Sequence, residues 1–363
     1  MTNKQRNRDP VVARNIKTWQ TIIQRRYREG EGGRINELLA PNYQWYGPAE
    51  TNYGLEGNDY PESLLKQSQQ LVNALNGFSI SHDMFGEGAM LANRYFISGK
   101  HDQPYGNIPA SGNRVNVYAI AIARFDPMGR LVEERECWDE LEFLKQIGAV
   151  KQQDATDLLS AIPEKHAHQL LENRTDTSEA LPSIKSLLFD NHDVMPEIRD
   201  SVVERNEQQW RAFLQKKFDT QDFSTLFDVV SPKWHWHAPA GVEIDLSEPG
   251  AVANFVDDLI ATKKCFPDIT FHSQVFGEGN RLLYHVVCEF THSAEMFGVP
   301  ATGKVIRQNN LAVCYCDQQG RVAKEWEIYD MLSVYKQLGV IHNDSQDINF
   351  HNLITSFSKK DVG

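Results

Sequence analysis

A long stretch of this chain is repeated farther along the sequence, always at the same distance. The tetrapeptide FGEG begins at Phe85 and again at Phe276, an offset of 191 positions. The same offset carries PASG at Pro109 onto PATG at Pro300. From residue 85 to residue 150 the copies align without a gap, and 20 of the 66 aligned positions are identical. Because this repeat is far longer than a solenoid unit, each copy is expected to be a domain with its own core.

The chain of 363 residues is long enough for two domains of ordinary size. We expect the first domain to cover residues 10–150 and the second to cover residues 196–342. Residues 151–195 have no partner in the repeat and are expected to form a linker that contains a helix. Residues 343–363 are expected to form a C-terminal tail.

Both copies show the same order of helical and strand-like segments. Apolar residues at helical spacing come first, and β-rich runs separated by Gly, Pro and Asp turns follow. In the first copy the expected helices are 12–29 and 59–75, and the expected strands are 42–46, 78–84, 90–101, 114–125 and 131–139. In the second copy the expected helices are 196–219 and 248–263, and the first strand is 233–237. This order predicts an α+β domain in which helices wrap a curved, mixed or antiparallel sheet.

The composition excludes several classes of partner. The formal net charge is −12, whereas a protein that binds duplex nucleic acid needs a basic face, so no nucleic-acid partner is expected. No run of about 18 apolar residues is present, so no membrane segment is expected. The polar start of the sequence lacks the apolar core of a signal peptide. The odd number of cysteines, five, is typical of reduced thiols and predicts a cytoplasmic protein.

Several motifs are shared with a known family. In the first copy they are residues 94–101 (RYFISGKH), 106–112 (GNIPASG), 124–126 (RFD), 129–134 (GRLVEE) and 138–141 (WDEL). In the second copy they are residues 298–303 (GVPATG), 325–330 (EWEIYD) and 337–339 (QLG). Together these motifs resemble the SnoaL-like polyketide cyclase family, over roughly residues 10–150 and 197–342.

The resemblance implies a fold and a kind of chemistry. The fold is that of nuclear transport factor 2, an α+β cone with a pocket inside, which also serves isomerases, dehydratases, epoxide hydrolases and binding modules. Proteins with this pattern are often described as ester cyclases, and those that cyclise polyketides use an aspartate acid and base without a metal or cofactor. A hydrophobic small molecule is therefore the expected ligand. Isolated domains of this fold pair through their sheets, so the tandem copies predict a pseudo-dimer within one chain.

A late strand in each copy carries the candidate catalytic carboxylate. Strand alternation puts one set of residues on one face in each copy, namely Glu133, Arg135, Cys137 and Asp139, and Lys324, Trp326, Ile328 and Asp330. We predict that this face lines the pocket, where desolvation would raise the pKa of a carboxyl group. The resemblance then implies Asp139 and Asp330 as acid–base residues. The alternative is that each aspartate N-caps the helix that follows it.

His101 and His292 occupy equivalent positions at the end of a long strand. A histidine beside a carboxylate can shuttle protons or orient a substrate carbonyl, so both are candidate catalytic residues. The alternative for His101 is a hydrogen bond to the loop of residues 106–112.

The copies differ at positions expected to contact a ligand. The pairs that differ are Tyr46 and His237, Arg94 and His285, and Arg135 and Trp326. An inward Arg135 would pair with Asp139 and lower its pKa, which makes the first copy either degenerate or suited to another ligand. Trp138, Trp236 and Tyr329 complete the expected ligand-binding residues as aromatic lining of a pocket or as ordinary core.

A metal site is an open alternative for the second copy. His235 and His237 lie two apart on an expected strand and, with His292 and Asp330, could supply mixed nitrogen and oxygen ligands. Because the family's chemistry needs no metal, we predict neither a metal ligand nor a cofactor.

The function predicted from the sequence is that of a cyclase or isomerase with an Asp/His acid–base pair in a hydrophobic pocket. The alternative is a non-catalytic protein that binds a small molecule, with one degenerate domain and one ligand-binding domain. A third interpretation is an interaction protein in which the first copy only supports the second.

Overall fold

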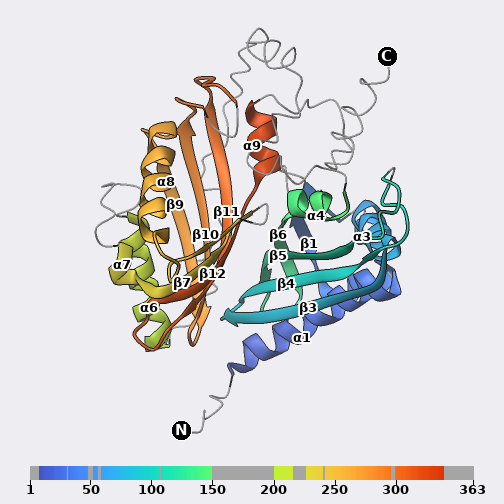
Figure 1. Ribbon diagram of the computed structural model, residues 1–363. Coiled ribbons are helices and arrows are strands. Elements are labelled where there is room, and N and C mark those ends of the chain that lie inside the picture. The colour runs from blue at the N-terminus through green and yellow to red at the C-terminus, as the bar shows by residue number, and fades with distance from the viewer. Residues whose placement is uncertain are drawn as a thin grey trace, which may run out of the picture.

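The computed structural model describes residues 8–30, 32–47, 52–55, 59–106, 108–148, 200–215, 226–239, 242–295 and 299–338. Within these residues the chain forms two six-stranded sheets, each with its own helices (Figure 1). The predicted linker and C-terminal tail lie outside the described residues, so the domain boundaries stay predictions.

The first domain has helices before and after its sheet strands. The helices are α1 (Pro10–Gln24), the π-helical turn η1 (Arg25–Glu29), α2 (Gly32–Ile35), η2 (Asn36–Leu38), α3 (Glu62–Ala74) and α4 (Glu140–Gln146). The strands are β1 (Leu39–Tyr46), β2 (Asn52–Gly54), β3 (Leu75–Glu87), β4 (Met90–His101), β5 (Arg114–Phe125) and β6 (Leu131–Trp138). The sheet order is β2-β1-β6-β5-β4-β3, in which β3 to β6 form an antiparallel meander and β1 joins β6 in parallel. The predicted meander is confirmed, whereas the short strand β2 was not predicted.

The second domain repeats this architecture. Its helices are α6 (Ser201–Gln215), α7 (Leu226–Val229), α8 (Ala251–Cys265) and α9 (Met331–Leu338). Its strands are β7 (Val230–His237), β8 (Glu243–Asp245), β9 (Thr270–Glu278), β10 (Arg281–Thr291), β11 (Val305–Cys316) and β12 (Val322–Tyr329). The order β8-β7-β12-β11-β10-β9 matches the first sheet strand for strand, which confirms the tandem α+β fold.

Helix α1 packs on one face of the first sheet, and its sequence explains why a helix forms there. Asp9 caps its N-terminus by accepting a hydrogen bond from the Val11 N–H, and Pro10 suits the first turn because its missing N–H is not needed there. Apolar residues recur every three or four positions along α1 and are buried, and they include Val12, Ile16 and Trp19. This stripe packs into the core of the first domain.

Both faces of each sheet are buried. Odd-numbered residues of β5, from Val115 to Phe125, belong to the core under the helices. Even-numbered residues of the same strand, such as Ile120 and Ile122, belong to a separate apolar cluster. That cluster also contains residues of the other domain, namely Phe276, Leu283, Leu311, Val313, Trp326 and Ile328. The two sheets therefore pack against each other and form the predicted pseudo-dimer.

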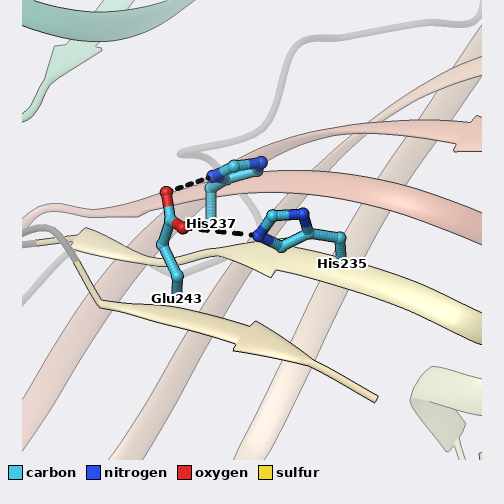
Figure 2. A group of neighbouring side chains, drawn as sticks. All are labelled: His235, His237 and Glu243. Carbon is cyan, nitrogen blue, oxygen red and sulfur yellow. Dashed lines mark hydrogen bonds and ion pairs between the residues drawn. The ribbon is translucent and has the colours of Figure 1, made fainter. Parts of the chain in front are cut away.

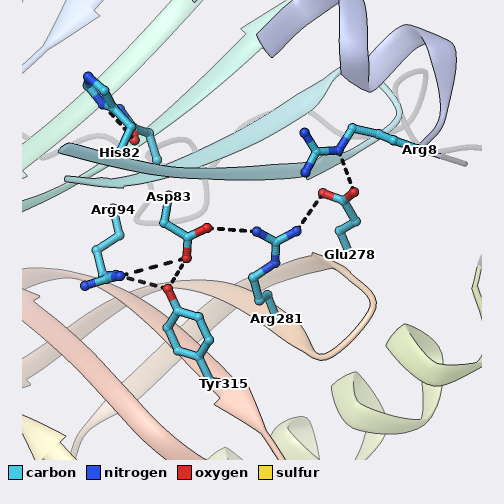
Figure 3. A network of polar contacts seen from close by, with 8 residues as sticks. Arg8, His82, Asp83, Arg94, Glu278, Arg281 and Tyr315 are labelled. Carbon is cyan, nitrogen blue, oxygen red and sulfur yellow. Dashed lines mark hydrogen bonds and ion pairs between the residues drawn. The ribbon is translucent and has the colours of Figure 1, made fainter. Parts of the chain in front are cut away.

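A polar network borders this interface and centres on Asp83 of β3 (Figure 3). The Asp83 carboxylate pairs with Arg281 of the second domain at 2.8 Å and accepts a hydrogen bond from the hydroxyl of Tyr315. Arg281 also pairs with Glu278 at 3.1 Å, and Glu278 pairs with Arg8 at 2.7 Å. Positively and negatively charged side chains of the two domains thus alternate along the edge of the apolar interface.

The described residues contain no helix long and apolar enough to cross a membrane. All five cysteines are free thiols, in agreement with the sequence.

Candidate active site

Two carboxylates lie on the inward face of β6, under the helices of the first domain. Glu134 and Glu136 are only 4% and 8% exposed. Their register partners on β5 are Ala123 and Ala121, which belong to the same core. A carboxylate in such a place must be paired or hydrogen-bonded, because an isolated buried charge is very costly.

Aromatic groups and one arginine satisfy these two carboxylates. Glu134 accepts hydrogen bonds from Trp19 Nε1 at 3.1 Å and from the Tyr43 hydroxyl at 3.4 Å. Glu136 pairs with Arg26 at 3.0 Å. It also accepts hydrogen bonds from Trp45 Nε1 at 3.1 Å and from the hydroxyl of Tyr95.

The protonation of Glu134 is tuned by this setting. Burial raises its pKa to about 7, and the nearby charge of Glu136 adds to the effect. Arg26 and the hydrogen bonds from Trp19 and Tyr43 oppose the rise. A carboxyl group with a pKa near neutrality can both give and take a proton at physiological pH.

The second domain repeats the pair as Glu325 and Glu327 on β12. Both are buried, at 2% and 5% exposure. Glu325 accepts hydrogen bonds from Trp234 Nε1 at 3.1 Å and from the Tyr284 hydroxyl. Glu327 accepts one from the Tyr329 hydroxyl at 3.2 Å. The position equivalent to Arg26 is Lys217, which lies outside the described residues.

The structure corrects the face that the sequence analysis assigned to the pocket. Cys137 and its counterpart Ile328 belong to the apolar cluster between the sheets, together with Trp326. On β6 the inward residues have even numbers and include Glu134, whereas on β12 they have odd numbers and include Glu325. Sequence reasoning missed both glutamate pairs because alternation shows which residues share a face but not which face is inward.

Several predicted ligand residues consequently lie on the face toward the other domain. Arg135 stacks on the ring of Tyr46 at 4.4 Å and pairs with Glu133 at 2.7 Å, where a pair with Asp139 was predicted. His285 is fully buried and hydrogen-bonded to Asn309. Burial, with a smaller contribution from Arg135, lowers the pKa of His285 to about 3, so its imidazole is neutral.

The remaining members of this set meet at Trp326. The Arg94 guanidinium lies 4.1 Å from the centre of the Trp326 ring. His237 stacks on Trp326, with ring centres 4.6 Å apart and planes 8° apart. Arg94 belongs to the first domain, so this cation–π contact joins the two domains.

Two of the three other aromatic candidates pack against the cores of their domains. Trp138 packs against the first core, with its ring centre 5.4 Å from that of Phe143. Trp236 stacks on Trp234 at 5.9 Å in the second core. Tyr329 faces Glu327, as described above. Their role as ligand-binding residues stays a prediction.

Asp139 and Asp330 both cap the helix that follows them. An Asp139 oxygen accepts a hydrogen bond from the Glu142 N–H at 3.1 Å, at the start of α4. An Asp330 oxygen accepts one from the Ser333 N–H at 3.0 Å, at the start of α9. Both aspartates are buried. The capping alternative is therefore confirmed, and an additional acid–base role stays a proposal.

His101 and His292 each hold the loop that follows their strand. Nδ1 of His101 accepts a hydrogen bond from the Ser111 N–H at 3.2 Å, and Nδ1 of His292 accepts one from the Thr302 N–H at 3.2 Å. Because Nδ1 is the acceptor, Nε2 carries the proton of the neutral ring. Burial lowers the pKa of both histidines. The predicted bond from His101 to its loop is confirmed.

The histidine pair of β7 meets a different partner from the one predicted. His235 and His237 converge on Glu243 of β8, where His292 and Asp330 were considered (Figure 2). Glu243 carried no signal in the sequence, because it reaches the histidines only through the pairing of β7 with the unpredicted strand β8.

Comparison with known proteins follows the division into two domains. The model of the SnoaL-like polyketide cyclase family matches residues 18–147 and again residues 208–338. These two matches together cover well over half of the chain. No curated protein matches the chain.

Solved structures are similar to one domain at a time. IdmH of Streptomyces antibioticus is 26% identical, with 37% of this chain and 99% of IdmH covered and a TM-score of 0.32. TsrD of Streptomyces laurentii is 25% identical, with 38% and 96% covered and a TM-score of 0.31. A SnoaL-like polyketide cyclase of Agrobacterium tumefaciens is 18% identical, with 37% and 98% covered and a TM-score of 0.31. Given the two family matches, this chain belongs to the SnoaL-like polyketide cyclase family and carries its domain twice.

Proposed function

We propose that this protein is an enzyme of the cyclase or isomerase type that acts on a hydrophobic small molecule without a cofactor. The observation that carries the proposal is the buried pair of carboxylates on the inward face of β6, repeated on β12. Cyclisation and isomerisation of carbonyl compounds begin with removal of a proton next to the carbonyl group, which needs a base tuned to the working pH. Glu134, with its pKa raised to about 7, has this property.

The Asp/His pair is a second acid–base set within the same proposal. The family resemblance implies Asp330 and its counterpart Asp139, and the equivalent positions of His292 and His101 at the end of a long strand make these histidines their candidate partners. Burial lowers the pKa of His292, so the ring is neutral near pH 7, and its Nε2–H is a donor that can orient a substrate carbonyl. The capping bond of Asp330 does not conflict with this role, because a helix cap uses one lone pair of a carboxylate.

We place the ligand against the inward aromatic residues. Trp236 and Tyr329 in the second domain, and Trp138 in the first, offer apolar surface on the same side as the carboxylates. A flat, apolar ligand fits such surroundings. Since all five cysteines are free thiols, a reducing compartment such as the cytoplasm suits the protein.

The alternative is a non-catalytic binding protein whose first domain is degenerate. It is favoured by the closed network in that domain, where Arg26 pairs with Glu136 and also donates to Ser68 at 2.7 Å. A carboxylate held by an arginine and two aromatic donors is a weaker base than one that faces a ligand. Under this alternative, ligand binding belongs to the second domain alone.

Deuterium exchange distinguishes these possibilities. The full chain is incubated in D₂O with a panel of aryl 1,3-dicarbonyl esters, and exchange at the carbon between the carbonyl groups is followed by NMR. We expect exchange with the native protein, and at least a ~100-fold loss for the variant that lacks the base. The variants are Glu134→Gln, Glu325→Gln, Asp330→Asn and, as a control with an exposed carboxylate, Glu295→Gln.

The asparagine variant separates catalysis from capping. Asparagine caps a helix about as well as aspartate, so Asp330→Asn should keep its melting temperature. Loss of exchange at an unchanged melting temperature would assign acid–base chemistry to Asp330. Esters that raise the melting temperature of the native protein without any exchange would establish the binding protein instead.

A further inference from the structure

Two histidines and a glutamate meet at the edge of the second sheet, on the face opposite the inward carboxylates. The parallel pairing of β7 with β12 sets His237 opposite Trp326, and the antiparallel pairing with β8 sets His237 opposite Glu243. His235 lies two residues before His237 and therefore shares its face. We propose that His235, His237 and Glu243 bind a divalent transition-metal ion such as Zn²⁺.

The positions of the three ligand groups fit one ion (Figure 2). One ligand atom from each residue lies within 4.8 Å of the other two. A Glu243 oxygen is 3.0 Å from His237 Nδ1, and its other oxygen is 3.5 Å from His235 Nε2. Ligand atoms of tetrahedral zinc lie about 3.4 Å apart, given bonds of about 2.0–2.1 Å. Small side-chain rotations would close the remaining distance, and Glu243 is free to make them at 60% exposure.

The charges around the site also suit a metal ion. Among the described residues, Lys324 of β12 and Asp245 of β8 both lie opposite His235 in the strand register. Their opposite charges offset each other, which leaves Glu243 to supply the negative charge.

Stacking on Trp326 holds one ligand in place. The His237 ring lies flat on the indole at 4.6 Å, so its orientation is set before any ion arrives. An ion bound here would keep a fourth position for water, since the described residues offer three ligands and the site opens to solvent through Glu243.

The first domain shows that the fold does not require these three residues. Its β1–β2 pair has the same geometry, yet Gln44, Tyr46 and Asn52 stand at the equivalent positions. Neither glutamine nor asparagine is a common ligand of zinc. The ligand set is thus peculiar to the second domain, and the first domain supplies replacements that this fold accommodates.

The test measures ion binding by the full chain. Zn²⁺ is titrated against a chromophoric chelator in the presence of the protein, and Cu²⁺ loading is followed by electron paramagnetic resonance. We expect one ion per chain and a copper spectrum with hyperfine structure from two nitrogens. His235→Gln, His237→Tyr and Glu243→Asn, which install the residues of the first domain, should each weaken Zn²⁺ binding ~100-fold or more, since even outer-shell changes cost 10–100-fold.

A matched control keeps the result specific. His272→Gln removes an exposed histidine of β9 and should leave stoichiometry and affinity unchanged. A native protein that binds no Zn²⁺ would overturn the proposal, as would His237→Tyr and Glu243→Asn variants that bind as tightly as the native chain. Because the readout is ion binding, it is independent of the proposed enzymatic activity.

Discussion

At the scale of single residues, the most informative group is Glu134. Its carboxyl is buried among Trp19, Tyr43 and a second carboxyl, and each of these contacts changes its proton affinity. Desolvation dominates and raises the pKa, because the interior disfavours the charged form. The same property that would make Glu134 a useful acid or base should therefore lower the stability of the protein as pH rises.

We predict that Glu134 makes the stability of the first domain depend on pH. The pKa rises from about 4.5 in the unfolded chain to about 7 in the folded domain. Below about pH 4.5 the Glu134 carboxyl is protonated in both the folded and the unfolded state, so it does not reduce the free energy of unfolding. Between about pH 4.5 and pH 7 the carboxyl loses its proton in the unfolded chain but keeps it in the folded domain, so the free energy of unfolding falls as pH rises. Relative to Glu134→Gln, the native protein should lose up to about 3 kcal/mol over this range.

Urea unfolding at a series of pH values measures this difference. The exposed Glu37→Gln serves as the control and should follow the native profile. Parallel pH profiles for the native protein and Glu134→Gln would contradict the raised pKa.

At the scale of elements, the repeated FGEG motif is explained by the hairpins that it opens. Gly86 and Gly277 lie near the end of β3 and β9, opposite the first residues of the next strand. A Cβ atom on Gly277 would lie 2.3 Å from the backbone oxygen of Arg281, and one on Gly86 would lie 2.3 Å from that of Met90. Glycine persists in both copies because the backbone of the partner strand occupies the space.

We predict that Gly277→Ala destabilises the second domain by about 1–3 kcal/mol, because the hairpin must shift to admit the methyl group. Gly33→Ala is the control: its Cβ would meet nothing within 4 Å, and alanine suits a helix better than glycine. Thermal unfolding should show a lower melting temperature for the first variant and an unchanged or slightly higher one for the second. Equal melting temperatures would refute the steric explanation.

At the scale of the whole molecule, the duplication places both halves of one interface in a single chain. The apolar outer faces of the two sheets cover each other, and the network around Asp83 joins them at the rim. Trp326, Arg94 and His285, which the sequence suggested as ligand contacts, lie on the faces that the two sheets turn toward each other. Some of the residues that differ between the two copies therefore differ because they belong to opposite sides of the same interface.

We predict that Asp83→Ala weakens the coupling between the domains. The change removes the partner that Arg281 has in the first domain. Because both side chains are only about one-fifth exposed, the loss of this ion pair should lower the free energy of unfolding by about 1–2 kcal/mol. Calorimetry should then show the two domains unfolding in separate transitions. Glu289→Ala breaks the 2.9 Å pair with Arg307 inside the second domain and should leave the coupling intact. A single transition shared by Asp83→Ala and the native protein would count against this role.

The sequence by itself determined the duplication, the α+β class and the meander of each copy, because spacing and turn residues are local properties. It also singled out His101 and Asp139, and it included their true local bonds among the alternatives. Only the tertiary structure decided which face of β6 and β12 is inward, because both faces are buried and strand alternation shows only which residues share a face. Because that face is inward, Glu134 and Glu325 became candidate acid–base residues. The pairing of β7 with β8 places Glu243 beside the two histidines, His235 and His237.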